Sequence, residues 1–372
     1  MRRPEAVPGI LTSADLVATA ESIVAQQEPS GAIPWFAPVD GVPGHVDAWN
    51  HVEAAMALSV AGFTEPARRA YAWLRGVQRE DGSWPAKWVM GEVTEPGGES
   101  NHAAYLAVGV WHELTLTGDL AFAGEMWPSV RRSVEFALGL QSARGEIMWM
   151  RNADGSVADH ALLTGCSSIY QSLRCAVALA ERLDEPQPDW ELAADQLGHV
   201  VACHPEAFAD KSRFSMDWYY PILGGPLRGA PAYRRIDERW DAFVVEGLGC
   251  RCVSDQPWVT GAESCELVLA LDAMGDTARA LELFATIQHL RHDDGSYWTG
   301  WQYANERHFP SDRSTYTAAA VILAADALVG GSPSARLFKE IAGRDLGPAG
   351  PADPVACGCE APSLADSLRT RR

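Results

Sequence analysis

The chain has 372 residues, of which 47% are hydrophobic and 21% are charged, values typical of a folded globular protein. Its net charge of −19 opposes phosphate backbones and anionic lipid surfaces, so we expect no nucleic-acid partner and no peripheral membrane role. No early apolar run is typical of a signal peptide, and no stretch approaches the roughly 20 apolar residues that span a bilayer. The sequence therefore predicts a cytoplasmic protein without a membrane span.

The cysteines do not follow a metal-binding or disulfide pattern. Two close pairs, Cys250/Cys252 and Cys357/Cys359, each enclose a single residue. Structural zinc sites usually place two to four residues between paired ligands. We therefore expect no metal and no cofactor, and the role of the two pairs stays open.

A repeated turn marks the first kind of predicted element, an amphipathic helix that ends in glutamine and is followed by glycine and then tryptophan. Glycine stops a helix by adopting a left-handed or turn conformation, and the tryptophan then packs back on the hairpin. In chain order the copies are Gln27–Gly31–Trp35, Gln78–Gly82–Trp84, Gln141–Gly145–Trp149 and Gln288–Gly295–Trp298.

A second kind of helix, more apolar and richer in alanine, follows each turn and its loop. Such helices are predicted over residues 49–62, 101–114, 167–180, 262–275 and 314–328, with a less regular copy near Asp217. The alternating helices, such as residues 65–78 and 119–141, carry charge on one face and apolar residues on the other. The pattern predicts buried inner helices surrounded by an outer layer.

The spacing of the inner helices predicts the architecture. Their starts recur about every 50 to 65 residues, the length of two helices and their connections, which gives roughly six hairpins. We therefore predict an all-α fold, an (α/α)6 toroid that forms one domain over residues 10–342. Residues 343–372, rich in proline, glycine and small polar residues, are predicted to form a disordered tail.

The polar residues at the starts of the inner helices should converge on one rim of the ring. The candidate substrate-binding residues there are Trp49, His51, Glu53, Glu99, Asn101, His102, Trp218, Tyr219, Asp255, Trp258, Tyr297 and Trp298, and the candidate catalytic carboxylates are Glu263, Asp217 and Asp47. Acidic residues at helix starts also cap backbone amides, and a buried histidine is often a structural one. Each residue alone therefore has a structural alternative.

Taken together, carboxylates and aromatic rings around a concave mouth match what neutral, polyhydroxylated ligands require. Two carboxylates on opposite sides of a glycosidic bond can act as general acid and general base. Our first assignment is Glu263 as the acid and Asp217 or Asp47 as the base. The sequence leaves the anomeric outcome open.

Several segments resemble actinobacterial proteins that are commonly labelled prenyltransferases, among them EPSGAIPWF, WNHVEAAMAL, QREDGSWP and SMDWYYPILGG. The DGSW turn is similar to the QW repeats of squalene and hopene cyclases. The resemblance implies an α/α toroid and an isoprenoid substrate. The D-x-D-D motif of those cyclases is absent, however, and Asp293-Asp294 is followed by Gly-Ser-Tyr rather than by a D-D-x-x-D motif.

The toroid and its acidic, aromatic rim also resemble six-hairpin glycosidases, sugar epimerases and polysaccharide lyases. Our leading interpretation is a carbohydrate-active enzyme, a metal-independent glycoside hydrolase that acts on a small-molecule sugar or glycoconjugate. One alternative is a prenyltransferase-like or terpenoid cyclase-like enzyme acting on an isoprenoid. Another is a noncatalytic binding protein whose rim carboxylates are capping groups paired with arginines such as Arg251. The oligomeric state stays open.

Overall fold

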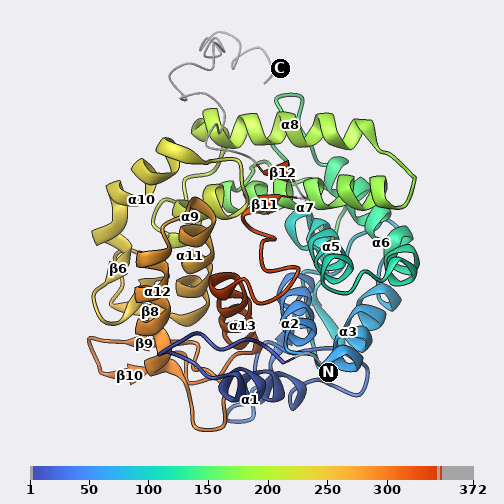
Figure 1. Ribbon diagram of the computed structural model, residues 1–372. Coiled ribbons are helices and arrows are strands. Elements are labelled where there is room, and N and C mark those ends of the chain that lie inside the picture. The colour runs from blue at the N-terminus through green and yellow to red at the C-terminus, as the bar shows by residue number, and fades with distance from the viewer. Residues whose placement is uncertain (1–2, 342–343, 346–372) are drawn as a thin grey trace.

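The computed structural model describes residues 3–341 and 344–345 and shows a ring of helices in two concentric layers (Figure 1). The inner layer consists of α2 (Ala48–Val60), α4 and α5 (Ser100–Ala104 and Leu106–Thr117), α7 (Leu163–Arg182), α9 (Ser215–Leu223), α11 (Gly261–Met274) and α13 (Thr315–Val329). Each inner helix packs against the next, and α13 packs against α2, which closes the ring.

The outer layer consists of α1 (Ser13–Val24), α3 (Thr64–Gly76), α6 (Leu120–Leu138), α8 (Pro188–Cys203), α10 (Gly229–Phe243) and α12 (Thr277–Thr286). Helix α1 packs on α13, and each of the others packs on the inner helix that precedes it. Within the described residues, the predicted (α/α)6 toroid and its phase are confirmed.

Burial separates the two layers as the sequence predicts. In α13 every residue from Thr315 to Ala327 is buried, because this helix has neighbours on all sides. In α3 the buried residues are Ala67, Ala70, Tyr71 and Leu74, which recur every three or four positions and face the inner layer. The charged residues of α3 occupy the opposite face.

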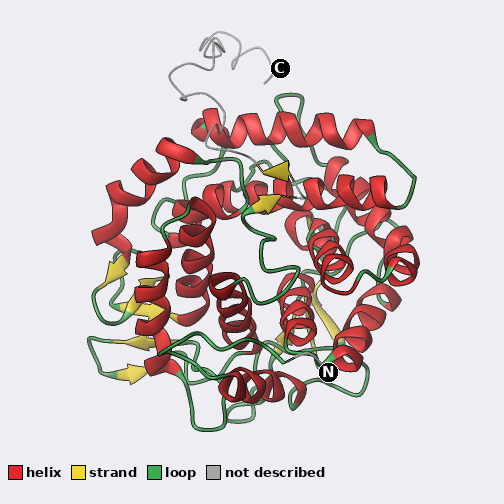
Figure 2. Ribbon diagram, in the orientation of Figure 1, coloured by secondary structure: helices red, strands yellow, loops and turns green. Residues whose placement is uncertain are grey.

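Short antiparallel strands, which were not predicted from the sequence, lie in the connections between the helices of the ring (Figure 2). Three of them directly precede inner helices: β1 (His45–Val46) before α2, β4 (Gly98–Glu99) before α4 and β8 (Trp258–Thr260) before α11. The sheets are β1-β2-β3, β4-β5 and β10-β9-β8-β7-β6, with β2 Lys87–Val89, β3 Glu92–Glu95, β5 Met150–Arg151, β6 Val244–Val245, β7 Gly249–Arg251, β9 Gly300–Gln302 and β10 Arg307–His308. The strands hold the connections that lead into the inner helices.

The repeated turn joins neighbouring hairpins through its glutamine. The Gln78 side-chain amide donates to the Gly82 carbonyl at 3.0 Å and to the Ser129 carbonyl of the next outer helix at 3.0 Å. Gln27 makes the same two bonds to Gly31 and Pro66, and Gln141 makes them to Gly145 and Ala193. In these three copies the glutamine ties the turn to the following outer helix, whereas the Gln288 amide donates to the Phe284 carbonyl of its own hairpin.

The glycine of this turn should tolerate no side chain. Gly82 has φ of +89°, and a Cβ atom there would lie 2.1 Å from the Arg132 carbonyl oxygen. We expect Gly82→Ala to lower the free energy of unfolding by about 2 kcal/mol or more, measured by urea denaturation. Gly91 has a similar φ of +78° with nothing within 4 Å, so Gly91→Ala should cost about 1 kcal/mol. Equal losses in the two variants would contradict the packing argument.

The predicted tail, residues 343–372, lies outside the described residues apart from Arg344–Asp345, which form β12 and pair with β11 (Glu340–Ile341). Cys357 and Cys359 also lie outside them. Within the described part of the chain, no helix combines the length and apolar character needed to cross a membrane.

Candidate functional site

A cavity of about 320 Å³ opens at the mouth of the ring. All six positions of the inner layer contribute to its wall through their first turns or the residues beside them. The lining residues are Trp35, Trp49, Asn50, Asn101, His102, Thr164, Met216, Tyr220, Cys252, Trp258, Thr260, Ala262, Glu263, Thr299 and Tyr316. The predicted convergence of inner-helix starts on one rim is therefore realised in the structure.

Glu263 is the carboxylate that lines this cavity. It lies in the first turn of α11 and is half-buried. The Cys252 thiol lies against it, and burial together with the Glu263 charge raises the pKa of Cys252 well above its usual range. The thiol therefore stays protonated and acts as a hydrogen-bond donor toward the Glu263 carboxylate.

Four lining residues have buried polar atoms without a hydrogen-bond partner among the described residues. These atoms are Asn50 Oδ1, Asn101 Oδ1, His102 Nδ1 and Thr260 Oγ1. A buried polar atom left without a partner costs about 1–3 kcal/mol, so native structures seldom collect several of them in one place. Their shared location makes them suitable partners for the hydroxyl groups of a bound ligand.

Aromatic rings form much of the remaining wall. The Trp49 ring stacks on Tyr105 with centroids 4.6 Å apart and also meets the edge of Tyr316. The Trp258 indole nitrogen donates to the Phe309 carbonyl at 2.6 Å. These contacts fix the rings in place, and fixed aromatic surfaces beside polar groups suit sugar rings.

Two carboxyl groups lie beneath the cavity floor. Glu266 accepts hydrogen bonds from the hydroxyls of Tyr219, Tyr220 and Tyr316, and the last two of these tyrosines line the cavity. Glu53 accepts one from Tyr105 at 2.7 Å. Burial raises the pKa of Glu53 to about 7, and burial with the neighbouring Glu53 raises the pKa of Glu266 to about 8.

The Glu266 network makes the stability of the fold depend on pH. Glu266 has an ordinary pKa of 4.5 and a pKa of about 8 in the folded state. Between these values the folded state binds more protons than the unfolded state, so stability falls as pH rises through this window. We expect Glu266→Gln to remove this decline, which amounts to roughly 4 kcal/mol between pH 5 and pH 9, measured by chemical denaturation at each pH. Parallel stability curves for wild type and variant would contradict the assignment.

The other two predicted catalytic carboxylates lie one side chain behind the cavity wall. Asp47 caps α2, and its oxygens accept from the Asn50 backbone amide at 2.8 Å and the Asn50 side-chain amide at 2.6 Å. Asp217 accepts from the Thr164 hydroxyl at 2.9 Å, and burial raises its pKa. Asn50 and Thr164 both line the cavity, so each carboxylate contacts a lining residue.

The predicted binding residues divide into groups. Trp49, Asn101, His102 and Trp258 line the cavity, and Glu99 lies just behind it, accepting from the Trp149 indole at 3.0 Å. The remaining predicted residues do not line this cavity. Asp255 forms an exposed ion pair with Arg213, and Trp298 lines a separate cavity. The others are buried in the protein interior: His51, Glu53, Trp218, Tyr219 and Tyr297.

The noncatalytic alternative expects rim carboxylates to be paired with arginines such as Arg251. In the structure this arginine donates hydrogen bonds to other groups. Its guanidinium donates to the Tyr303 hydroxyl at 3.0 Å and to the Ala242 carbonyl at 2.7 Å. Glu263 thus faces the cavity beside a thiol.

A search against protein-family models finds no match. The sequence is 54% identical over 353 residues to the MMP endo-(1,4)-3-O-methyl-alpha-D-mannosidase of Mycolicibacterium hassiacum, covering 95% of this chain and 96% of the relative. The chain belongs to the family of this mannosidase. As a member of the mannosidase family it is a glycoside hydrolase, as the leading interpretation of the sequence predicts.

Solved structures agree with the fold. A glycosidase variant in complex with glucose superimposes with a TM-score of 0.65 at 15% identity, covering 85% of this chain and 97% of the other. A D-mannose isomerase superimposes with a TM-score of 0.63 at 12% identity, covering 87% of this chain and all of the other. This chain therefore shares its α/α toroid with a glycosidase and a D-mannose isomerase, and these comparisons do not show membership of the prenyltransferase-labelled family.

Proposed function

We propose that the protein is an endo-acting mannosidase that hydrolyses α-(1,4) bonds between 3-O-methylmannose units, the activity that the name of its relative describes. The observation that carries this proposal is the cavity at the ring mouth, which Glu263 lines together with four residues that carry buried polar atoms without a partner in the described structure. Hydroxyl groups of a sugar would satisfy those atoms, and the aromatic wall would contact the sugar ring. The substrate of this proposal is a methylmannoside oligosaccharide, a chain of 3-O-methylmannose units joined by α-(1,4) bonds.

In the proposed reaction Glu263 is the general acid and gives its proton to the glycosidic oxygen as the bond to the anomeric carbon breaks. Asp217 or Asp47 accepts a proton from the water that attacks the anomeric carbon, so the products are two shorter sugars. Both carboxylates are set back behind Asn50 or Thr164, so the one that serves as base would take the proton from the attacking water through a second water molecule. Burial also raises the pKa of Asp217, which strengthens it as a base.

The test compares hydrolysis by wild type, Asp47→Asn and Asp217→Asn, with proton NMR recording the anomer released first. The variant that removes the base should lose about 10²- to 10⁴-fold in kcat, whereas the other should change mainly in KM or stability. Release of the α-anomer first would indicate retention and would contradict the set-back base. Absence of hydrolysis by the wild-type protein would overturn the proposed function.

The isoprenoid alternative gains no support from the cavity. Polyene cyclisation requires a deep apolar pocket that excludes water. The wall here carries Asn50, Asn101 and Glu263, and the floor is built on the Glu266 network. We therefore retain the sugar substrate.

The cytoplasmic location stays a prediction from the sequence.

A further inference from the structure

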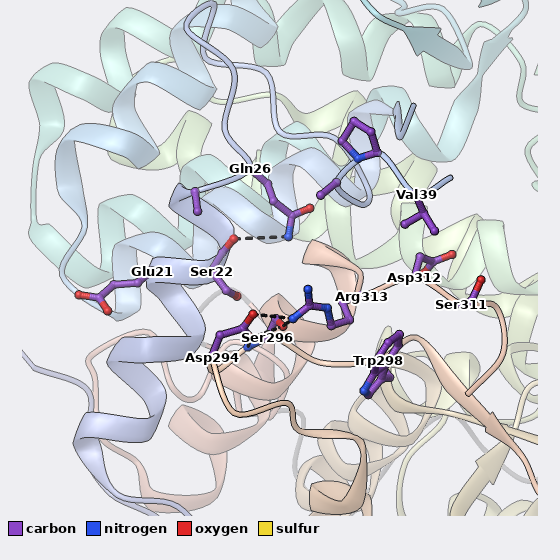
Figure 3. A pocket seen from close by; sticks show the side chains of 13 residues that line it. Glu21, Ser22, Gln26, Val39, Asp294, Ser296, Trp298, Ser311, Asp312 and Arg313 are labelled. Carbon is purple, nitrogen blue, oxygen red and sulfur yellow. Dashed lines mark hydrogen bonds and ion pairs between the residues drawn. The ribbon is translucent and has the colours of Figure 1, made fainter. Parts of the chain in front are cut away.

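A second and larger cavity, of about 600 Å³, lies beside the mouth of the ring. Helix α1 forms one side with Ser22 and Gln26, and the opposite side carries Trp298, Asp312 and Arg313 (Figure 3). The loop that contains Ala37, Pro38 and Val39 completes the wall. Of the residues named here, Trp298 is the one that belongs to the predicted binding set.

Three chain segments run from the mouth cavity to this second cavity. The mouth cavity is lined by Trp35, Thr299 and Tyr316. In the same three segments, residues 37–39, Trp298 and residues 311–313 line the second cavity. The Thr299 hydroxyl donates to the Asp312 carboxylate across this shared wall. The two cavities are therefore adjacent parts of one rim.

The wall of the second cavity carries the chemistry of a sugar site. The Trp298 ring is half-buried and is held by His308, which stacks on it with centroids 4.3 Å apart and planes 10° apart. The Arg313 guanidinium lies 5.6 Å from the Trp298 ring centroid and donates to Ser296 at 2.9 Å. A fixed indole flanked by a carboxylate, a guanidinium and hydroxyls matches a polyhydroxylated ring.

The loop side of the cavity adds an apolar surface. Ala37 and Pro38 are exposed and Val39 is half-buried, and all three line the cavity. An O-methyl group on a sugar presents a small apolar surface that would lose contact with water on such a wall. The cavity thus offers separate contacts for the hydroxylated and the methylated parts of one sugar unit.

We propose that the second cavity is a distal subsite of the same substrate cleft, binding a 3-O-methylmannose unit remote from the bond that Glu263 cleaves. Trp298 and Arg313 contact the sugar ring, Asp312 accepts from its hydroxyls, and residues 37–39 contact its O-methyl group. This inference rests on the proposed function for the identity of the sugar. It explains how an enzyme of this kind would select a long chain and cut it internally, because a disaccharide cannot occupy both cavities.

The test measures a long methylmannoside oligosaccharide and a methylmannoside disaccharide against wild type, Trp298→Ala and Trp301→Ala. Trp301 is the matched control, because it contacts the same His308 ring but lines neither cavity. Calorimetry should show the Kd of the long ligand raised about tenfold in Trp298→Ala, the effect of losing one aromatic contact, with little change in Trp301→Ala. Turnover of the disaccharide should stay within about twofold in Trp301→Ala, and the loss in Trp298→Ala should be larger for the long ligand than for the disaccharide.

A second variant keeps the test independent of folding. Ala37→Arg places a bulky side chain at an exposed position on the cavity wall and should weaken the long ligand alone, with an unchanged melting temperature. Equal affinity of wild type, Trp298→Ala and Ala37→Arg for the long ligand would overturn the subsite. Because this readout is binding, it is separate from the proposed function, which fails if the wild-type protein binds the oligosaccharide without cleaving it.

Discussion

Glu263→Gln is expected to lower kcat on a methylmannoside oligosaccharide by about 10³-fold, because the amide cannot give a proton to the glycosidic oxygen. The substitution keeps the size of the side chain, which is half-buried at the cavity wall. The melting temperature should therefore stay within about 2 °C of wild type. Release of reducing ends measures kcat, and calorimetry with the same oligosaccharide should show that binding is kept.

The matched control for this prediction is Glu92→Gln. Glu92 lies on the exposed strand β3, outside both cavities, and carries the same change of charge. It should leave kcat within about twofold of wild type. Full activity in Glu263→Gln, or an equal loss in the two variants, would show that Glu263 is not the acid.

Trp84→Ala is expected to have the largest effect on stability, a loss of about 3–5 kcal/mol in the free energy of unfolding. Trp84 follows the Gln78–Gly82 turn, is 1% exposed, and donates from its indole nitrogen to the Leu74 carbonyl of α3 at 2.8 Å. Its removal leaves a large cavity inside the hairpin and takes away the hydrogen-bond donor of the Leu74 carbonyl. Denaturation in urea measures the loss.

Trp301→Ala provides the comparison, since this tryptophan is half-buried on a short strand at the rim. Its loss should cost about 1–2 kcal/mol, because less apolar area leaves water on folding. A cost below about 1 kcal/mol for Trp84→Ala would contradict the role given to the repeated tryptophan.

The fold follows from features that sequence alone displays. Alanine-rich apolar helices alternating with amphipathic ones predict two layers, because a helix without a polar face must be surrounded. The repeated glutamine, glycine and tryptophan then set the phase, and the inner-helix starts at one rim bring Trp49, Asn101, His102, Trp258 and Glu263 to a single cavity.

Helical phase explains why other predicted residues are elsewhere. His51 lies one position after Asn50, yet its ring faces outward, bonding the Ala70 carbonyl of α3 at 2.9 Å. Trp218 turns away from the mouth to stack on Phe243 of α10. A rotation of about 100° per residue separates neighbours on a helix, so proximity to a helix start does not determine which face a residue occupies.

Glu266 was missed for a related reason. It lies three residues after Glu263 on the same face of α11, a spacing that could have drawn attention to it. Its three tyrosine partners come from two other helices, which no local pattern reveals. The second cavity was not predicted either, because it lies between helix α1 and loops that come together only in the closed ring.

The most direct test of the central claim, that the mouth cavity is the active site of an endo-acting mannosidase, is mass spectrometry of cleavage products. A methylmannoside oligosaccharide labelled at its reducing end is incubated with wild type or with Glu263→Gln. We predict internal fragments of intermediate length from the wild type and intact oligosaccharide from the variant. Recovery of intact oligosaccharide from the wild type, or the same fragments from both proteins, would contradict the claim.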